Sequence, residues 1–228
     1  MGILDLFFPK YCVSCRKVGT YLCPPCFSRV SFINSSVCGV CSKSSFDGFT
    51  HKYCRKKYTI DGIFASVVYT PTLRKLIASF KYKPYVTDLS ELLTTLFFEG
   101  LIQNEFFYST LTKESFFVPI PLHRTKERMR GYNHASILSL KLSKHFDLVN
   151  KDLLVRVRKT TSQFGLKREE RVENIEGAFD IRRNISFPPV VFLVDDIVTS
   201  GVTFLEAGKV LKRNGVEKVY GLALAHGR

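Results

Sequence analysis

The sequence predicts an α/β protein, with a mostly parallel β-sheet flanked by helices and a small metal-binding module in front of it. Three observations predict this fold. All seven cysteines lie in the first 54 of 228 residues. Apolar stretches of strand length alternate with amphipathic helical stretches from residue 60 onward. The run 190–194 is continuously apolar, as a strand buried on both faces requires. We therefore expect a zinc-binding module at 1–57 and an α/β domain at 58–228.

Composition excludes several classes of protein. Hydrophobic residues make up 45% and aromatic residues 13%, which supplies a core and excludes general disorder. No apolar run approaches the ~20 residues of a membrane helix, so we expect no membrane insertion. The start has no basic leader, which predicts a cytoplasmic protein. The net charge of +14 calls for an anionic partner, such as nucleic acid, a phosphorylated metabolite or anionic lipid.

The N-terminal cysteines form pairs with the spacing of zinc knuckles. Three pairs are C-x2-C, and a fourth is H-x2-C. Two intervening residues let both ligand atoms of a pair face one ion, and about 50 residues rarely fold without such help. The sequence therefore predicts structural zinc with closed coordination. The eight candidate ligands are Cys12, Cys15, Cys23, Cys26, Cys38, Cys41, His51 and Cys54.

Other uses of the same residues stay open at this stage. Disulfides are disfavoured by the odd cysteine count and the absence of a leader, and an iron–sulfur cluster is not excluded by spacing. The pairing of ligands is also open. Consecutive pairs would place 12/15 with 23/26 and 38/41 with 51/54. A cross-braced arrangement, or one zinc ion with leftover thiols, would use the same side chains.

The α/β region begins with a strand at 60–70 that is rich in Ile, Val, Phe and Tyr. Pro71 opens a helix whose leucines have helical spacing, and a second helix is expected at 86–102. Prolines bound the next strand, at 116–120. The alternation of strands and helices predicts parallel pairing.

The remaining elements follow the same order. We expect a helix at 132–146 and a short strand at 153–157 that leads into a polar, basic loop. The buried strand at 190–194 precedes a helix at 203–214, and 219–225 is the last strand.

The segment from Val190 to Thr203 carries the most specific pattern. The apolar strand is followed by Asp195 and Asp196, at the carboxyl edge of the sheet, where α/β proteins bind ligands. A loop of Thr, Ser and Gly then leads into a helix, whose free amides suit a phosphate. The acids would instead accept hydrogen bonds from sugar hydroxyls, or simply cap the helix or face solvent. The candidate loop residues are Thr199, Ser200, Gly201, Val202 and Thr203.

This segment resembles the fingerprint of type I phosphoribosyltransferases. The resemblance implies a type I phosphoribosyltransferase-like parallel sheet. It also implies that Asp195 and Asp196 hold the ribose hydroxyls of phosphoribosyl pyrophosphate (PRPP), while the loop cradles the 5′-phosphate. The activity implied is a phosphoribosyl transfer with Mg²⁺, in which positioning and charge neutralisation carry catalysis.

Two further stretches resemble the competence protein F (ComF) family. Val118-Pro119-Ile120-Pro121-Leu122, followed by the arginines and Asn133 of 124–133, is similar to that family's VPxPL…R…RGxN segment. Residues 158–179 resemble its R-x-T-x-x-Q…R…N…F block, which includes Ser162 and Gln163. With the cysteine pairs, which match a double zinc ribbon, the resemblance covers nearly the whole chain. It departs at His51 and His134.

The basic residues are the candidates for pyrophosphate contacts. Related transferases carry a flexible catalytic loop after the strand at 153–157, so we expect Arg158 and Lys159 to contact pyrophosphate. Lys81 is a further candidate. For the basic residues of 124–130, a solvated helix face weighs equally with a function. The isolated histidines, His134 among them, are expected to have packing or surface roles.

Two functions fit these observations. One is a phosphoribosyltransferase that acts on PRPP and serves DNA uptake or nucleotide utilisation. The other is a non-catalytic competence factor that binds single-stranded DNA or the competence machinery, with the transferase fold as a platform or nucleotide sensor. Arg55, Lys56 and Lys57 beside the zinc knuckles suit a DNA backbone, and Tyr53 or Tyr58 would stack on bases.

Overall fold

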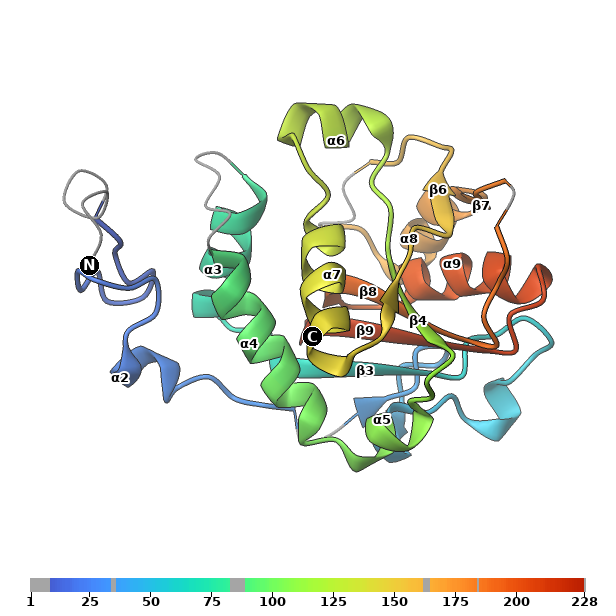
Figure 1. The fold of residues 1–228 in the computed structure, drawn as a ribbon, viewed down its shortest axis with the longest axis horizontal. Coiled ribbons are helices and arrows are strands. Elements are labelled where there is room, and N and C mark those ends of the chain that lie inside the picture. The colour runs from blue at the N-terminus through green and yellow to red at the C-terminus, as the bar shows by residue number, and fades with distance from the viewer. Residues whose placement is uncertain (1–8, 34–35, 83–88, 162–164, 184, 228) are drawn as a thin grey trace.

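A five-stranded parallel sheet forms the centre of the molecule, in the order β3-β9-β8-β4-β5 (Figure 1). The computed structural model describes residues 9–33, 36–82, 89–161, 165–183 and 185–227. The predicted α/β class with a parallel sheet is confirmed. The strands are β3 (Gly62–Val68), β4 (Ser115–Pro119), β5 (Val149–Asn150), β8 (Val190–Val198) and β9 (Lys218–His226).

Helices cover both faces of this sheet. One face packs against α3 (Pro71–Lys81), α4 (Leu89–Ile102) and α7 (His134–Phe146), and the other against α9 (Val202–Arg213). This arrangement, with a core on each face of the sheet, explains the apolar run in β8. Phe192 and Val194 face the first core, whereas Val191 and Leu193 face the second. The helix expected at 86–102 starts at Leu89 within the described residues, and 86–88 lie outside them.

Strand β8 is longer than the sequence predicts. It continues to Val198 because β9 continues beside it, pairing Asp195 with Ala223. On its other side β8 loses its partner earlier, since the last β4 pair joins Pro119 to Val194. The two acids therefore lie on a strand that is hydrogen-bonded on one side and open on the other.

The segment after β5 differs most from expectation. The strand expected at 153–157 is β6 (Leu154–Arg156), which pairs antiparallel with β7 (Phe179–Ile181) outside the main sheet. The expected basic loop contains helix α8 (Arg168–Ile175), whose only buried residue is Ile175. Because so little of this helix is buried, its sequence lacks the regular spacing of apolar residues by which a helix is predicted. Two further short helices, α5 (Glu105–Thr110) and α6 (Arg124–Arg130), lie before and after β4 in the chain.

The N-terminal module lies along the free edge of the sheet. Phe32 bridges Val67 of β3 in antiparallel fashion, and the amide of Ile33 donates to the Ser66 carbonyl at 3.0 Å. The module thereby covers an edge that would otherwise expose unpaired backbone groups. The domain boundary at residue 58 stays a prediction. The elements of the module are α2 (Pro24–Phe27), β1 (Ser36–Val37), β2 (Ser44–Ser45), η1 (Phe46–Gly48) and η2 (Lys52–Cys54).

No helix in the described part of the chain is both long and apolar enough to cross a membrane.

Candidate metal centres and ligand site

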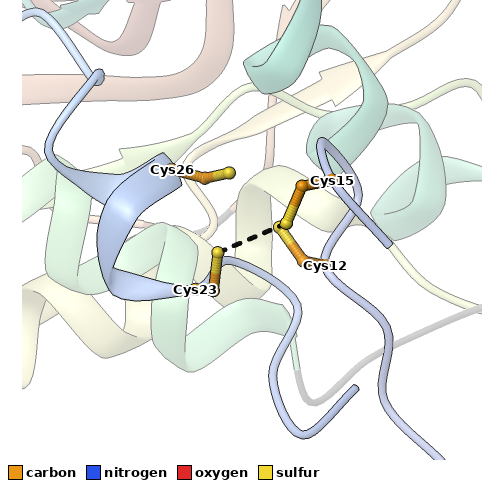
Figure 2. A group of neighbouring side chains, drawn as sticks. All are labelled: Cys12, Cys15, Cys23 and Cys26. Atoms are coloured by element: carbon orange, nitrogen blue, oxygen red, sulfur yellow. Dashed lines mark hydrogen bonds between the residues drawn. The ribbon is translucent and has the colours of Figure 1, made fainter. Parts of the chain in front are cut away.

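The first four cysteines converge on one point (Figure 2). The ligand atoms of Cys12, Cys15, Cys23 and Cys26 all lie within 4.8 Å of one another, and the Sγ atoms of Cys15 and Cys23 are 3.5 Å apart. Tetrahedral zinc with its usual bond lengths separates two thiolates by about 3.8 Å. This group therefore fits a structural zinc ion.

The second group contains Cys38, Cys41, His51 and Cys54, again within 4.8 Å. His51 Nδ1 is 3.3 Å from Cys41 Sγ, and its Nε2 lies 2.9 Å from the Ser44 carbonyl. A carbonyl accepts only, so Nε2 carries the proton, and Nδ1, which also lies 3.0 Å from the Tyr53 hydroxyl, is the nitrogen that faces the metal position. The structure groups the predicted ligands as consecutive pairs, not as a cross-brace.

The two knuckles repeat one backbone pattern. The amide of Arg16 donates to the Cys12 carbonyl at 2.9 Å, and that of Ser42 donates to the Cys38 carbonyl at 2.8 Å. Both donors adopt a left-handed conformation, with φ of 66° for Arg16 and 58° for Ser42. The module is thus an internal duplication of the knuckle, which is visible in the backbone.

Backbone amides favour the thiolate form of the first cysteine of each knuckle. Burial raises the pKa of Cys12, but hydrogen bonds from nearby amides, that of Cys15 foremost, lower it overall to about 6. The pKa of Cys38 is lowered in the same way. Burial next to other thiols raises the pKa of Cys23 to about 12 and that of Cys54 to about 11. A divalent cation would relieve this conflict by letting all the thiols ionise.

A second cluster surrounds the acidic pair on β8. Lys81, the last residue of α3, forms an ion pair with Oδ2 of Asp196. His134, the first residue of α7, places Nε2 3.3 Å from Oδ1 of Asp196 and 3.7 Å from Oδ1 of Asp195. The ends of two helices on one face of the sheet therefore deliver a cation and an imidazole to the acids.

Arg130 sets the tautomer of this imidazole. Its Nη1 is 2.7 Å from Nδ1 of His134. A guanidinium only donates, so Nδ1 accepts and Nε2 carries the proton that faces the carboxylates. His134 is 5% exposed, and it lies at the centre of the cluster instead of having the packing or surface role expected for it.

The environment drives the two acidic pKa values apart. Burial alone would raise the pKa of Asp196, but Lys81 and His134 outweigh it and hold that pKa below its ordinary value. The pKa of Asp195 is raised, chiefly by burial and also by the charge of Asp196. Burial lowers the pKa of Lys81, yet the two carboxylates raise it overall. Asp196 is therefore ionised at neutral pH, whereas Asp195 is the acid whose protonation state a bound ligand would change.

The loop after β8 forms an open pocket next to the acids. Gly201 caps the N-terminus of α9 in a left-handed conformation with φ of 74°, so the amide end of the helix faces this loop. Ser200 Oγ is buried without a hydrogen-bond partner among the described residues. The pocket holds about 230 Å³, partly open to solvent, and is lined by Asp195 and residues 197–204. Amides and a hydroxyl in this arrangement suit a phosphate.

Four cations gather beyond the acids with little negative charge among them. Burial lowers the pKa of Lys126, and the charges of Arg156, Arg130 and Lys159 lower it further. The Nε atom of Arg156 is buried without a partner in the described structure, and the one acid that affects its pKa is Asp195. Such mutual repulsion costs stability, so the cluster suits a polyanion that would relieve it.

Comparisons with known proteins agree with this architecture. The family model for a double zinc ribbon domain matches residues 3–56. Competence protein F of Haemophilus influenzae is 40% identical over 113 residues, which is 47% of this chain and 49% of that protein. The chain thus spans about half the length of this relative. The DNA utilization protein YhgH of Escherichia coli K12 is 27% identical over 94% of this chain and 96% of its own.

Competence protein ComFC of Bacillus subtilis is also similar, 26% identical over 90% of this chain and 79% of its own. These similarities support the resemblance to the competence protein F family. The N-terminal residues match a double zinc ribbon domain.

Only some of the residues predicted to contact pyrophosphate lie near the acids. Lys81 and Lys159 belong to the two clusters just described. Arg158 instead donates to the carbonyls that end α8, at 3.1 Å to Asn174 and 3.1 Å to Glu176. Its pyrophosphate role stays a prediction, whereas the charge of Asp195 affects the pKa of its neighbour Arg156. Ser162 and Gln163 lie outside the described residues.

Sequence reasoning missed two members of the ligand site, His134 and Arg156, and for Arg130 it weighed a function equally with a solvated helix face. Arg130 and His134 stand four positions apart but belong to different helices, so no single period links them. Arg156 lies on the short strand β6. For His134 the sequence did hold one indication, because it occupies a position where the chain departs from the family pattern.

Proposed function

We propose that the protein binds PRPP and transfers or recognises its phosphoribosyl group. One observation carries this proposal: a pocket lined by Asp195 and by residues 197–204 joins the acidic end of β8 to the glycine-capped terminus of α9. Carboxylates suit two sugar hydroxyls, and the amides of a helix N-terminus suit the phosphate attached to the same sugar. The residues proposed for the 5′-phosphate are Thr199, Ser200, Gly201, Val202 and Thr203.

The cations supply the rest of the ligand. Lys126, Arg130, Arg156 and Lys159 would neutralise the pyrophosphate group, and Lys81 would exchange its bond to Asp196 for a ligand oxygen. In a transfer reaction, C1 would form a bond to a nucleophilic atom of an acceptor as its bond to the pyrophosphate oxygen breaks, and these cations would stabilise the charge that develops on the leaving pyrophosphate.

Magnesium fits this site as the ion of the ligand. Carboxylate oxygens are ligands that Mg²⁺ accepts, but Asp196 already pairs with Lys81 and faces His134. Asp195 is the better-placed donor. The ion would neutralise pyrophosphate, while the chain orients the sugar and the phosphate.

We further propose a cytoplasmic role in DNA uptake or DNA use. The support comes from relatives whose names are competence protein and DNA utilization protein. A nucleotide-binding site and a basic, zinc-stabilised module in one chain suit such a role.

Calorimetric titration of the zinc-loaded protein with PRPP and Mg²⁺ tests the proposal. We expect micromolar affinity in the wild type and a loss of at least tenfold in Asp195→Asn, which removes one sugar-binding carboxylate. Asp152→Asn, an exposed acid paired with Arg182, is the matched control and should bind as the wild type does. No binding of the wild type at millimolar PRPP would contradict the proposal.

A second function, binding of single-stranded DNA, is favoured by the second zinc site. Tyr53 there is 75% exposed beside Arg55 and Lys56, although one face of its ring stacks on His51. Tyr58 is less available, because Lys57 and Arg213 cover its ring. Fluorescence anisotropy with a labelled oligonucleotide at rising salt measures this binding. A steep loss with salt and with Tyr53→Ala would support it, and salt-independent binding would not.

A further inference from the structure

One arginine joins the second zinc knuckle to the ligand loop. Nη1 of Arg168 donates to the hydroxyl of Ser42 and to the carbonyl of Ser200, each at 2.7 Å. Nη2 donates to the carbonyls of Gly39 at 3.1 Å and Val40 at 2.6 Å. A single guanidinium therefore ties three residues of the knuckle to the loop proposed to bind phosphate.

The two backbones are also in direct contact. A Cβ atom on Gly201 would lie 3.1 Å from the carbonyl oxygen and 3.3 Å from the Cα of Gly39. The knuckle that carries Cys38 and Cys41 thus forms a wall against which the loop is packed. Gly39 and Val40 are the two residues between these cysteines, so metal binding sets the direction of their carbonyls.

The first knuckle is placed differently. Its Ser14 accepts a long hydrogen bond from Thr72 at the start of α3, at 3.4 Å. Cys12 and Cys23 pack into the core beside the same helix. The two zinc sites repeat one backbone pattern, yet they brace different parts of the sheet.

We propose that Arg168 is a positioning residue that couples zinc at the second site to ligand binding at residues 199–203. Zinc holds the carbonyls of the knuckle toward Arg168, and Arg168 in turn holds the Ser200 carbonyl. The orientation of that peptide group directs the Gly201 amide into the pocket. Because coupling between two sites is reciprocal, the ligand must also strengthen zinc binding at the second site. This inference rests on the proposed function, with PRPP as the ligand.

The two zinc sites supply matched variants for the test. Each of Cys15→Ser and Cys41→Ser removes one ligand from one site. We expect Cys41→Ser to weaken PRPP binding, measured by calorimetry, on the order of tenfold, which is typical of such coupling. Cys15→Ser should stay within about twofold of the wild type, since its site braces α3 instead.

The arginine itself is tested with both zinc ions in place. Arg168→Ala should weaken PRPP binding as much as Cys41→Ser does, and Arg168→Lys should restore little, because one ammonium cannot reach four acceptors. Arg182→Ala, which removes an exposed arginine paired with Asp152, is the control. These variants keep all the zinc ligands, so they decide the question if a cysteine variant fails to fold.

Zinc release supplies a measurement that a merely structural role would not change. In a chelator competition assay, PRPP should slow the release of one of the two zinc ions from the wild type by about the same factor as above. In Arg168→Ala, PRPP should leave both release rates unchanged. Wild-type affinity in Arg168→Ala, or release rates insensitive to PRPP in the wild type, would overturn the coupling alone. A wild type that binds no PRPP would overturn the proposed function and the coupling together.

Discussion

The ion pair between Lys81 and Asp196 allows a test of whether the charged groups of the ligand site also stabilise the fold. Their side chains are 18% and 4% exposed, and the pair lies between the end of α3 and strand β8. At contact distance and an effective dielectric constant near 20, two unit charges attract by about 4 kcal/mol. Asp196→Asn keeps the shape and removes the direct partner of the ammonium, which leaves Asp195 as its acidic neighbour; we expect this to cost about 3 kcal/mol.

For a chain of this size that cost corresponds to a fall in Tm of about 6–12 °C. Lys81→Met should cost less, because His134 still faces the carboxylate. The double variant removes both charges, so its cost should fall short of the sum by at least about 1.5 kcal/mol. The assay is denaturant unfolding of the zinc-loaded protein, with the four free energies combined in a double-mutant cycle.

The exposed pair between Lys141 and Glu91, with side chains 27% and 74% exposed, is the control cycle. It should show a coupling below about 0.5 kcal/mol. An equally small coupling for Lys81 and Asp196 would refute the reasoning.

The pH dependence of this cost follows from the lowered pKa of Asp196. A carboxyl group with a pKa lower in the folded than in the unfolded chain contributes its full stability above its unfolded pKa of about 3.9. That contribution is lost only as the pH falls below this value. The cost of Asp196→Asn should therefore be smaller at pH 3 than at pH 5, and an equal or larger cost at pH 3 would contradict the assignment.

Three further predictions concern the zinc module and the ligand loop. Cys12→Ser should lower the metal content from two zinc ions per chain to one, and unchanged content by mass spectrometry would rule out the first site. His134→Ala should cost about 2 kcal/mol of unfolding free energy because buried acceptors lose their donor, and His134→Gln, which keeps a donor, should cost less. Gly201→Ala should destabilise more than Gly215→Ala, since both have positive φ but only Gly201 is packed against Gly39. Equal Tm values for the two alanine variants would remove that explanation.

Local patterns in the sequence were enough for the fold class and the zinc ligands. A strand buried on both faces must be apolar throughout, so the strand at Val190–Val194 can be predicted from the sequence. Knuckle spacing is equally local, because two ligands of each pair sit on one turn. The order of strand, acids, glycine loop and helix in residues 190–203 likewise concerns a single segment, and Asp195 and residues 197–203 of it line one pocket.

Only the tertiary structure decided which distant groups meet. The pairing of zinc ligands, the contact of His134 with the acids and the bridge from Arg168 to Ser200 each join segments far apart in the sequence. Single side chains in such contacts leave no periodic pattern, since one histidine or one arginine satisfies them. The length of β8 was also hidden, because it depends on how far β9 runs beside it. Local chemistry determined the parts of the site, and the packing of helices and knuckles around the sheet edge determined their partners.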